Sequence, residues 1–323
     1  MGRLFQNFWP GLCTIMHGLL RWLRRPPPHG VRRGRCCIDV PPDVYKRADP
    51  LIYAQYYLMN MGLSVTWDNP DIQLFDHGVP VPPSTRLLPD HLYEVQVRVW
   101  NGSYDAPAAG VGVQLSYLSF GVATTTHPIA TAVISLGVKG SPHCPAFASF
   151  RWRTPASTGH YCLQARLDWV DDANPQNNLG QKNVEVGVAH SPACFTFQLR
   201  NAASVRRGFV LEADAYQLPA PRPCHDRAPP RAPTRIAESR ARWQVALREQ
   251  GRGTSPVPAD WKVTIDPREL TLAPDEERTI QVAIEPRNSA FTGTRSFNIH
   301  AFAVGDGTDL QLAGGVTLQV TRS

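Results

Sequence analysis

The first candidate for chemistry is a loop near the middle of the chain that is dense in oxygen ligands. Its carboxylate and amide side chains belong to Asp168, Asp171, Asp172, Asn174, Asn177 and Asn178. Calcium prefers six to eight oxygen ligands of these kinds, so the loop is a candidate calcium site, although its spacing is not that of an EF-hand. The simpler interpretation is a turn between strands, in which Asp and Asn side chains cap their own backbone. The sequence therefore predicts no cofactor, with calcium at this loop as the alternative.

A second set of residues combines imidazoles and thiols, which are zinc ligands. It consists of His143, Cys144, His160 and Cys162. Because side chains alternate along a strand, His160 and Cys162 share one face, whereas the adjacent His143 and Cys144 do not. A buried cysteine beside exposed histidines is therefore the preferred interpretation, and zinc is the alternative.

The sequence carries no motif of a familiar catalytic site. It has no GxSxG nucleophile elbow, no HExxH metal motif and no glycine-rich phosphate loop. The Gly-x-Gly segments at 110–112 and 305–307 lie in β contexts and precede no helix. We therefore expect no enzymatic activity, and a hydrolase with an unrecognised site is an alternative.

Tryptophans are the residues that would bind a sugar by stacking. The candidates are Trp100, Trp152, Trp169 and Trp243. The cores of β-sandwiches use tryptophan as readily, and core positions are the preferred interpretation for those on strands. A carbohydrate-binding accessory module is the resulting second hypothesis.

Residues 1–25 have the pattern of a basic, amphipathic helix. Its apolar face consists of Leu12, Ile15, Met16, Leu19, Trp22 and Leu23, and the opposite face carries His17, Arg21, Arg24 and Arg25. The apolar run is too short to span a bilayer, and its charges follow the run instead of preceding it as in a signal peptide. The helix is expected to contact an anionic membrane surface, or to dock on a partner or on the protein itself.

The positive charge of the chain is concentrated at the N-terminus. Residues 1–38 contain seven arginines and no acidic residue, which leaves 26 basic and 27 acidic residues in the rest of the chain. The globular part is therefore close to neutral, and no nucleic-acid partner is expected. The seven scattered cysteines form no obvious disulfide framework, which slightly favours a cytoplasmic or peripheral membrane location over secretion. Cys36-Cys37 is an alternative lipidation site.

Alternating apolar and polar residues predict two series of strands, which follow a Pro/Arg-rich linker at residues 26–49. In the first domain, residues 50–190, a short helix precedes strands that begin near Asp71 and continue at 91–100, 111–120, 129–138, 147–153, 161–170 and 184–188. In the second, residues 191–323, strands are expected at 194–199, 209–218, 261–265, 269–272, 279–284, 296–304 and 316–320. An insertion at about 219–257 contains a Pro/Arg loop and a short helix. The predicted fold class is all-β, with two immunoglobulin-like antiparallel β-sandwiches in tandem.

Three segments of the first series carry a resemblance to a known family. They are Tyr93–Trp100 (YEVQVRVW), Val111–Phe120, and Asp168–Asn178 (DWVDDANPQNN), which leads into Asn183–Val188. Over about residues 70–190 the chain resembles the bacterial CARDB family of immunoglobulin-like domains, which is named for a link with cell adhesion.

The end of the chain carries a second resemblance. Its segments are Pro258–Asp260, Trp261–Pro267, Leu270–Glu276, Phe291–Gly293 and Gly314–Val320. They resemble NEW3-type β-sandwich modules found beside bacterial glycosidases and proteases, although Asp275 replaces the usual glycine of one turn. This resemblance implies a non-catalytic accessory or adhesive role. An arginine-rich N-terminal helix is typical of neither family.

These patterns predict a non-enzymatic binding, adhesion or scaffold protein that presents two sandwiches to a protein partner or a surface. A membrane surface is a further expected partner through residues 1–38. Carbohydrate is the partner under the second hypothesis. The sequence names no individual partner, because sandwich folds host many unrelated functions.

Overall fold

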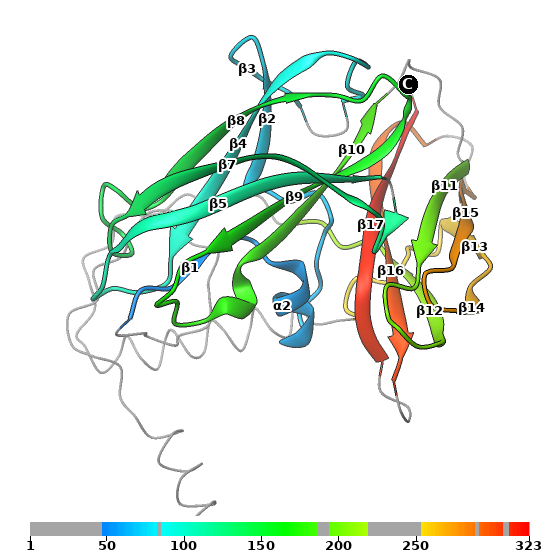
Figure 1. Ribbon diagram of the computed structural model, residues 1–323. Coiled ribbons are helices and arrows are strands. Elements are labelled where there is room, and N and C mark those ends of the chain that lie inside the picture. Colours follow the sequence, from blue (N-terminus) through cyan, green and yellow to red (C-terminus); the bar gives the residue numbers. More distant parts are fainter. Residues whose placement is uncertain are drawn as a thin grey trace, which may run out of the picture.

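The chain folds into two β-sandwiches in the computed structural model (Figure 1). The structure describes residues 47–82, 85–119, 121–186, 194–218, 253–287, 291–305 and 310–322. The predicted N-terminal helix at 1–25, most of the linker and the helix expected in the insertion lie outside these residues. For the described part, the predicted all-β fold class with two antiparallel sandwiches is confirmed.

The first sandwich consists of two antiparallel sheets. One contains β1 (Pro50–Leu51), β4 (Leu92–Asn101), β2 (Ile72–Asp76) and β3 (Val79–Pro80), in that order, with β8 (Ala146–Arg153) paired to β4. The other has the order β10 (Leu179–Val186), β9 (Gly159–Asp168), β5 (Ala108–Ser119), β7 (Thr126–Leu136). Helix α2 (Gln55–Asn60) lies between β1 and β2 in the chain.

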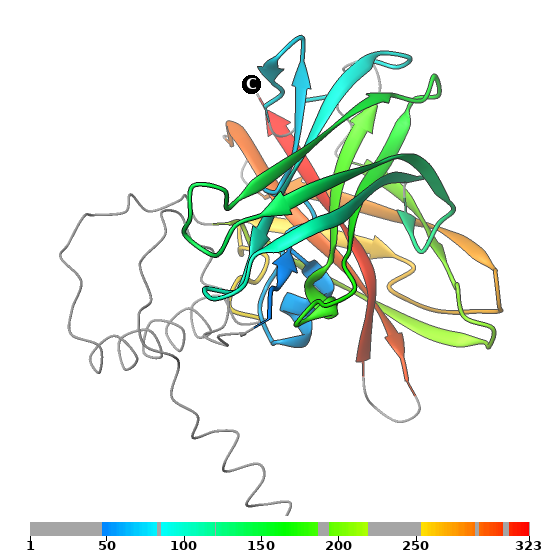
Figure 2. The ribbon, with the colours of Figure 1, turned by 60° about the vertical axis from the view of Figure 1, so that its left-hand side comes forward.

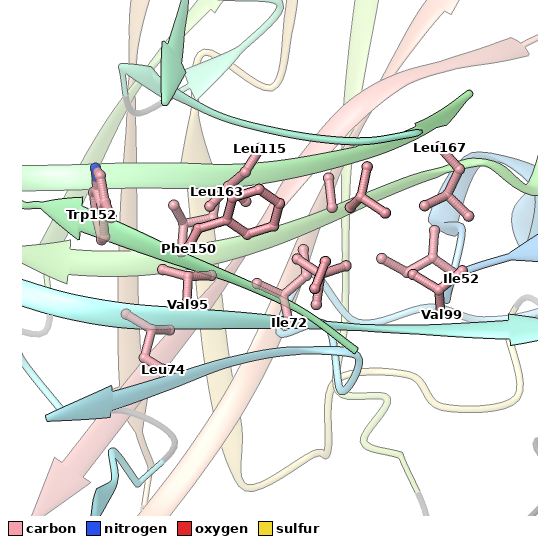
Figure 3. Close-up of a cluster of buried hydrophobic side chains, with 14 of the residues drawn as sticks. Ile52, Ile72, Leu74, Val95, Val99, Leu115, Phe150, Trp152, Leu163 and Leu167 are labelled. Atoms are coloured by element: carbon pink, nitrogen blue, oxygen red, sulfur yellow. The ribbon is translucent and has the colours of Figure 1, made fainter. Parts of the chain in front are cut away.

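The core of the first sandwich follows from the period of two along its strands. On β4, Val95, Val97 and Val99 are fully buried, while the residues between them are partly exposed. In Figure 3, Val95 and Leu74 on one sheet lie near Leu115 and Leu163 on the other. These apolar faces exclude water between the sheets and hold the strands in register.

The second sandwich is also built from two sheets. One has the order β13 (Trp261–Asp266), β15 (Glu277–Pro286), β11 (Cys194–Arg200), β6 (Gly121–Val122). The other has the order β14 (Glu269–Leu272), β12 (Arg207–Asp214), β16 (Gly293–Val304), β17 (Leu310–Arg322). Phe197, Leu211, Ile280, Phe297 and Leu318 are among its buried core residues.

Two predicted strands differ in detail from those observed. The expected face of Val111, Val113, Leu115, Tyr117 and Ser119 breaks, because a register shift between Leu115 and Ser116 rotates the strand so that Leu118 is buried instead. The strand expected at 209–218 ends at Asp214, whose carboxylate accepts a hydrogen bond from the Tyr216 backbone N–H (3.0 Å) and turns the chain.

The turn between β14 and β15 contains Asp275, the residue that departs from the predicted NEW3-type resemblance. Asp275 adopts a left-handed backbone conformation (φ 61°) at the position where a glycine is usual. Asp tolerates this conformation better than most residues, and its backbone N–H donates to the Asn201 carbonyl oxygen (2.9 Å). The turn between β14 and β15 therefore closes without a glycine.

Strand β6 links the two sandwiches in a way that the sequence pattern did not predict. It lies between β5 and β7 in the chain, yet it pairs in parallel with β11 of the second sandwich, Val122 opposite Leu199. Val122 is 2% exposed and belongs to the second core. The hairpin of one sandwich therefore supplies a strand to the other.

Candidate functional site

The two sandwiches meet where Trp67 packs against β17. The Trp67 side chain is fully buried, and Gly315 lies directly beneath its indole ring. A Cβ atom at position 315 would come within 2.3 Å of Trp67 Nε1 and 2.5 Å of the Ile299 carbonyl oxygen. Only glycine therefore allows this close approach. The long strand β17 runs beside the first sandwich in both ribbon views (Figures 1 and 2).

A bulge beside Gly315 supplies a second contact. The register of β16 and β17 shifts after Ala301, so that Ala313 has no opposite residue. Its carbonyl oxygen accepts a hydrogen bond from the Tyr56 hydroxyl (3.1 Å). Burial raises the pKa of Tyr56, so the hydroxyl stays protonated and remains a donor.

Buried and partly buried polar side chains complete this junction. Trp67 Nε1 donates to His300 Nδ1 (3.3 Å), and His300 Nε2 lies 2.9 Å from Asp214 Oδ2. Asn298 Nδ2 donates to Asp214 Oδ1 (2.7 Å), while Asn298 Oδ1 accepts from the Thr317 hydroxyl (2.7 Å). We refer to Trp67, Asp214, Asn298, His300, Gly315 and Thr317 as the junction network.

The junction network contains an acid–base pair of the kind that hydrolases use, but both imidazole nitrogens of His300 are engaged. Since indole N–H can only donate, His300 Nδ1 must accept, and Nε2 then carries the proton that is donated to Asp214. His300 is 3% exposed. This arrangement leaves no free nitrogen to act as a general base and instead joins the sandwiches.

The residues of the predicted calcium loop lie around the 3-10 helix η1 (Pro175–Asn177). The two carboxylate oxygens of Asp172 accept from the Asn174 backbone N–H (2.9 Å) and from Asn178 Nδ2 (2.7 Å). Burial raises the pKa of Asp172, while these two hydrogen bonds oppose the increase. These are the contacts expected if the loop is a turn between strands whose Asp and Asn side chains cap the local backbone.

The side chains of the other polar residues of the predicted calcium loop do not converge on Asp172, and those with side-chain contacts have different partners. Asp171 pairs with Arg47 (3.2 Å), and Asn177 Nδ2 donates to Asp49 Oδ1 (3.0 Å). Asp168 ends β9 and is exposed, while Asn174 caps η1 by accepting from the Gln176 backbone N–H (3.4 Å). The turn stays the preferred interpretation of this loop, and calcium binding stays the untested alternative.

The structure does not bring the predicted zinc set together. His143 is exposed, and Cys144 Sγ accepts from the Asn101 backbone N–H (3.3 Å). Cys162 is buried, and burial raises the pKa of its thiol to about 12, which disfavours the thiolate that zinc requires. Among the described residues, the His, Cys, Asp and Glu side chains that do lie within metal-binding distance are a different set: Asp76, His77 and His91.

The candidate sugar-binding tryptophans do not form one platform. Trp152 is in the first core, Trp100 donates to Asp71 Oδ1 (3.0 Å), and Trp169 donates to the Ala109 carbonyl oxygen (3.1 Å). Trp243 lies outside the described residues. The core interpretation therefore holds for Trp152, while Trp100 and Trp169 are half-buried.

An exposed face on the first sandwich is a candidate binding surface. Val133 on β7 is 70% exposed. The register places exposed polar residues on the same side of β5, β7 and β9. We call this surface the β7 face, and its residues are Gln114, Thr131, Val133, Arg166 and Asp168. At one end of this sheet β7 pairs only with β5 among the described strands.

The predicted membrane or partner contact lies outside the described residues. It consists of Leu12, Ile15, Met16, Leu19, Arg21, Trp22, Leu23, Arg24 and Arg25. In the described part of the chain, no helix has the length and apolar character needed to cross a membrane.

No protein-family model matches the sequence, and no curated protein matches it. Among solved structures, the CARDB domain of a Pyrococcus furiosus protein in complex with di-metal ions is 21% identical, with 38% of this chain and 94% of that one covered and a TM-score of 0.27. The C-terminal domain of Wzt is 14% identical over 50% of this chain and 84% of that one (TM-score 0.23). The Yersinia pseudotuberculosis adhesin InvE is 11% identical over 73% and 57% of the two chains (TM-score 0.19).

We expect Gly315→Ala to lower the free energy of unfolding by about 1–3 kcal/mol, because the new methyl group displaces Trp67. Urea unfolding followed by tryptophan fluorescence measures the change. Gly208→Ala on β12 is the matched control, since its Cβ would lie 3.4 Å from Val304 Cγ2, an ordinary contact. Equal losses in the two variants would show that the Trp67 contact does not control stability.

We expect calcium at about 5 mM, above the Kd of weak extracellular sites, to leave the melting temperature unchanged. The reason is that both oxygens of Asp172 already accept hydrogen bonds and that Asp171 pairs with Arg47. Differential scanning fluorimetry in calcium and in EDTA makes the comparison. An increase in melting temperature that Asp172→Asn abolishes would establish the calcium site instead.

Proposed function

We propose that this chain is a non-catalytic binding or scaffold protein that holds two joined sandwiches at a fixed geometry for a protein partner. The basic N-terminal 38 residues serve as its tether to a membrane surface or a larger assembly. The CARDB-like and NEW3-like patterns of the sequence agree with such a role.

The observation that carries this proposal is the strand that the first sandwich supplies to the second. Strand β6 leaves the first sandwich and pairs with β11, and Val122 is buried in the second core. Trp67 is buried on Gly315 at the same junction. Because packed interfaces resist continuous deformation, the surfaces of the two sandwiches keep a constant spacing. A fixed distance between the surfaces of the two sandwiches lets a scaffold hold its partner in one orientation.

The use of the titratable groups supports a non-catalytic role. Asp214, whose side chain is 15% exposed, and the buried His300 form an acid–base pair, and both contribute their polar atoms to contacts within the junction network. Catalysis would need a free nitrogen or oxygen facing a substrate. Because the polar atoms of Asp214 and His300 are used in contacts within the junction network, these residues favour a structural role over a catalytic one.

We assign partner binding to the β7 face. Val133 offers an exposed apolar side chain, and the polar Thr131, Gln114 and Arg166 form the next row across β7, β5 and β9 on the same face. Protein interfaces combine apolar contacts with a polar rim, and arginine is enriched in them. The face consists of paired strands, so it binds with little loss of backbone entropy.

Val133→Arg tests this assignment, because it replaces the exposed apolar side chain of the β7 face with a long charged one. We expect cross-linking of the full chain in an extract of its native source to yield a partner that Val133→Arg loses. Val170→Arg is the matched control, since Val170 is fully exposed in the loop after β9. A partner that both variants retain would refute this surface, and selective binding to a glycan array would favour the carbohydrate hypothesis.

Deletion of residues 1–38 tests the tether. We expect the full chain to sediment with phosphatidylserine vesicles and the deleted chain to stay in solution, because each basic residue near an anionic surface contributes about 1 kcal/mol. Added salt should weaken the binding, and neutral phosphatidylcholine vesicles are the control. Vesicle binding that survives the deletion would contradict the tether.

A further inference from the structure

The turn between β2 and β3 places two potential metal ligands side by side. Asp76 ends β2, and His77 and Gly78 form the two-residue turn before β3. Both turn residues have left-handed backbone angles, φ 48° for His77 and 80° for Gly78. This is the geometry of a tight hairpin turn, which glycine adopts freely and histidine adopts less often.

A third potential ligand comes from the start of the neighbouring strand β4. The backbone N–H of His91 donates to the Thr154 hydroxyl (2.9 Å), and the His91 ring packs edge-on against Tyr93 with ring centroids 4.7 Å apart. The Tyr93 hydroxyl in turn accepts from the Leu88 backbone N–H (3.0 Å). These contacts hold the imidazole of His91 in position before any ligand binds.

The distances among the three side chains suit a small cation. Asp76 Oδ1 lies 2.9 Å from His91 Nε2 and 3.7 Å from His77 Nε2. The ligand atoms of all three residues lie within 4.8 Å of one another. Zinc bonds of 2.0–2.1 Å in a tetrahedral site place neighbouring ligand atoms about 3.3–3.4 Å apart. These two distances lie on either side of this value, so small movements of the side chains would bring the ligand atoms to it.

We propose that Asp76, His77 and His91 form a surface site for a divalent transition metal, and that zinc is the metal it binds. Two imidazoles and one carboxylate suit zinc and its neighbours in the first transition series, whereas magnesium and calcium prefer all-oxygen sites. The His77 side chain is 87% exposed, so the fourth coordination position faces solvent. That position is open to water. This site does not depend on the proposed scaffold function.

The experiment is a titration of the full chain with Co²⁺, whose d–d absorption reports tetrahedral coordination, followed by competition with zinc. Cys36→Ser and Cys37→Ser in the background remove a pair of thiols that would compete for the metal. We expect one equivalent to bind without thiolate-to-cobalt charge transfer. His77→Ala should weaken binding by at least about tenfold, since even the loss of an outer-shell partner costs 10–100-fold.

The control variants distinguish this site from the remaining histidines and thiols of the chain. His77 is exposed, so His77→Ala is expected to fold normally, whereas His91→Ala also loses the contact with Asp76. His143→Ala removes an exposed histidine of the other potential zinc set and should bind cobalt as the parent chain does. Binding that His77→Ala leaves unchanged, or that His143→Ala weakens equally, would overturn the proposal. A thiolate charge-transfer band would also overturn it.

Discussion

The contact of the Trp67 indole with the backbone at Gly315 is the constraint on which the rest of the structure depends. A side chain at position 315 would collide with the indole nitrogen and with the Ile299 carbonyl oxygen. With glycine there, the ring lies against the sheet, and its N–H reaches His300. The same approach brings Tyr56 to the bulged carbonyl of Ala313. The absence of a side chain at position 315 therefore allows these contacts of the junction to form.

The junction changes the character of strand β16. Its inward side chains, such as Phe297 and Ile299, are buried in the second core, while Asn298 and His300 on its other face are buried beneath the first sandwich. A strand of an isolated sandwich would leave that polar face in water. Here the buried polar atoms are paired with one another and with Trp67, and a fully satisfied network of this kind specifies one arrangement of its partners.

The two surfaces proposed for binding both lie on the first sandwich. The β7 face is formed by β5, β7 and β9 of one sheet. In the cluster of Asp76, His77 and His91, the first two residues lie at the turn between β2 and β3, and His91 directly precedes β4. In Figure 1 that turn is at the opposite end of the sandwich from α2, which contacts β17. A metal ion there would leave the junction network untouched. Rigidity and binding are therefore assigned to different parts of the molecule.

The sequence by itself determined the strands and the fold class, because burial of every second side chain is a local property that alternating residues such as Val95, Val97 and Val99 reveal. It also indicated Trp152 as a core residue. Only the tertiary structure decided which strand β6 pairs with, because its partner β11 is distant in the chain. The face on which Leu118 lies depends on a bulge, and the burial of His300 depends on packing against the first sandwich. The metal cluster was missed for the same reason: His77 and His91 meet only because β2 and β4 pair in one register, whereas the adjacent His143 and Cys144 are not brought to Cys162.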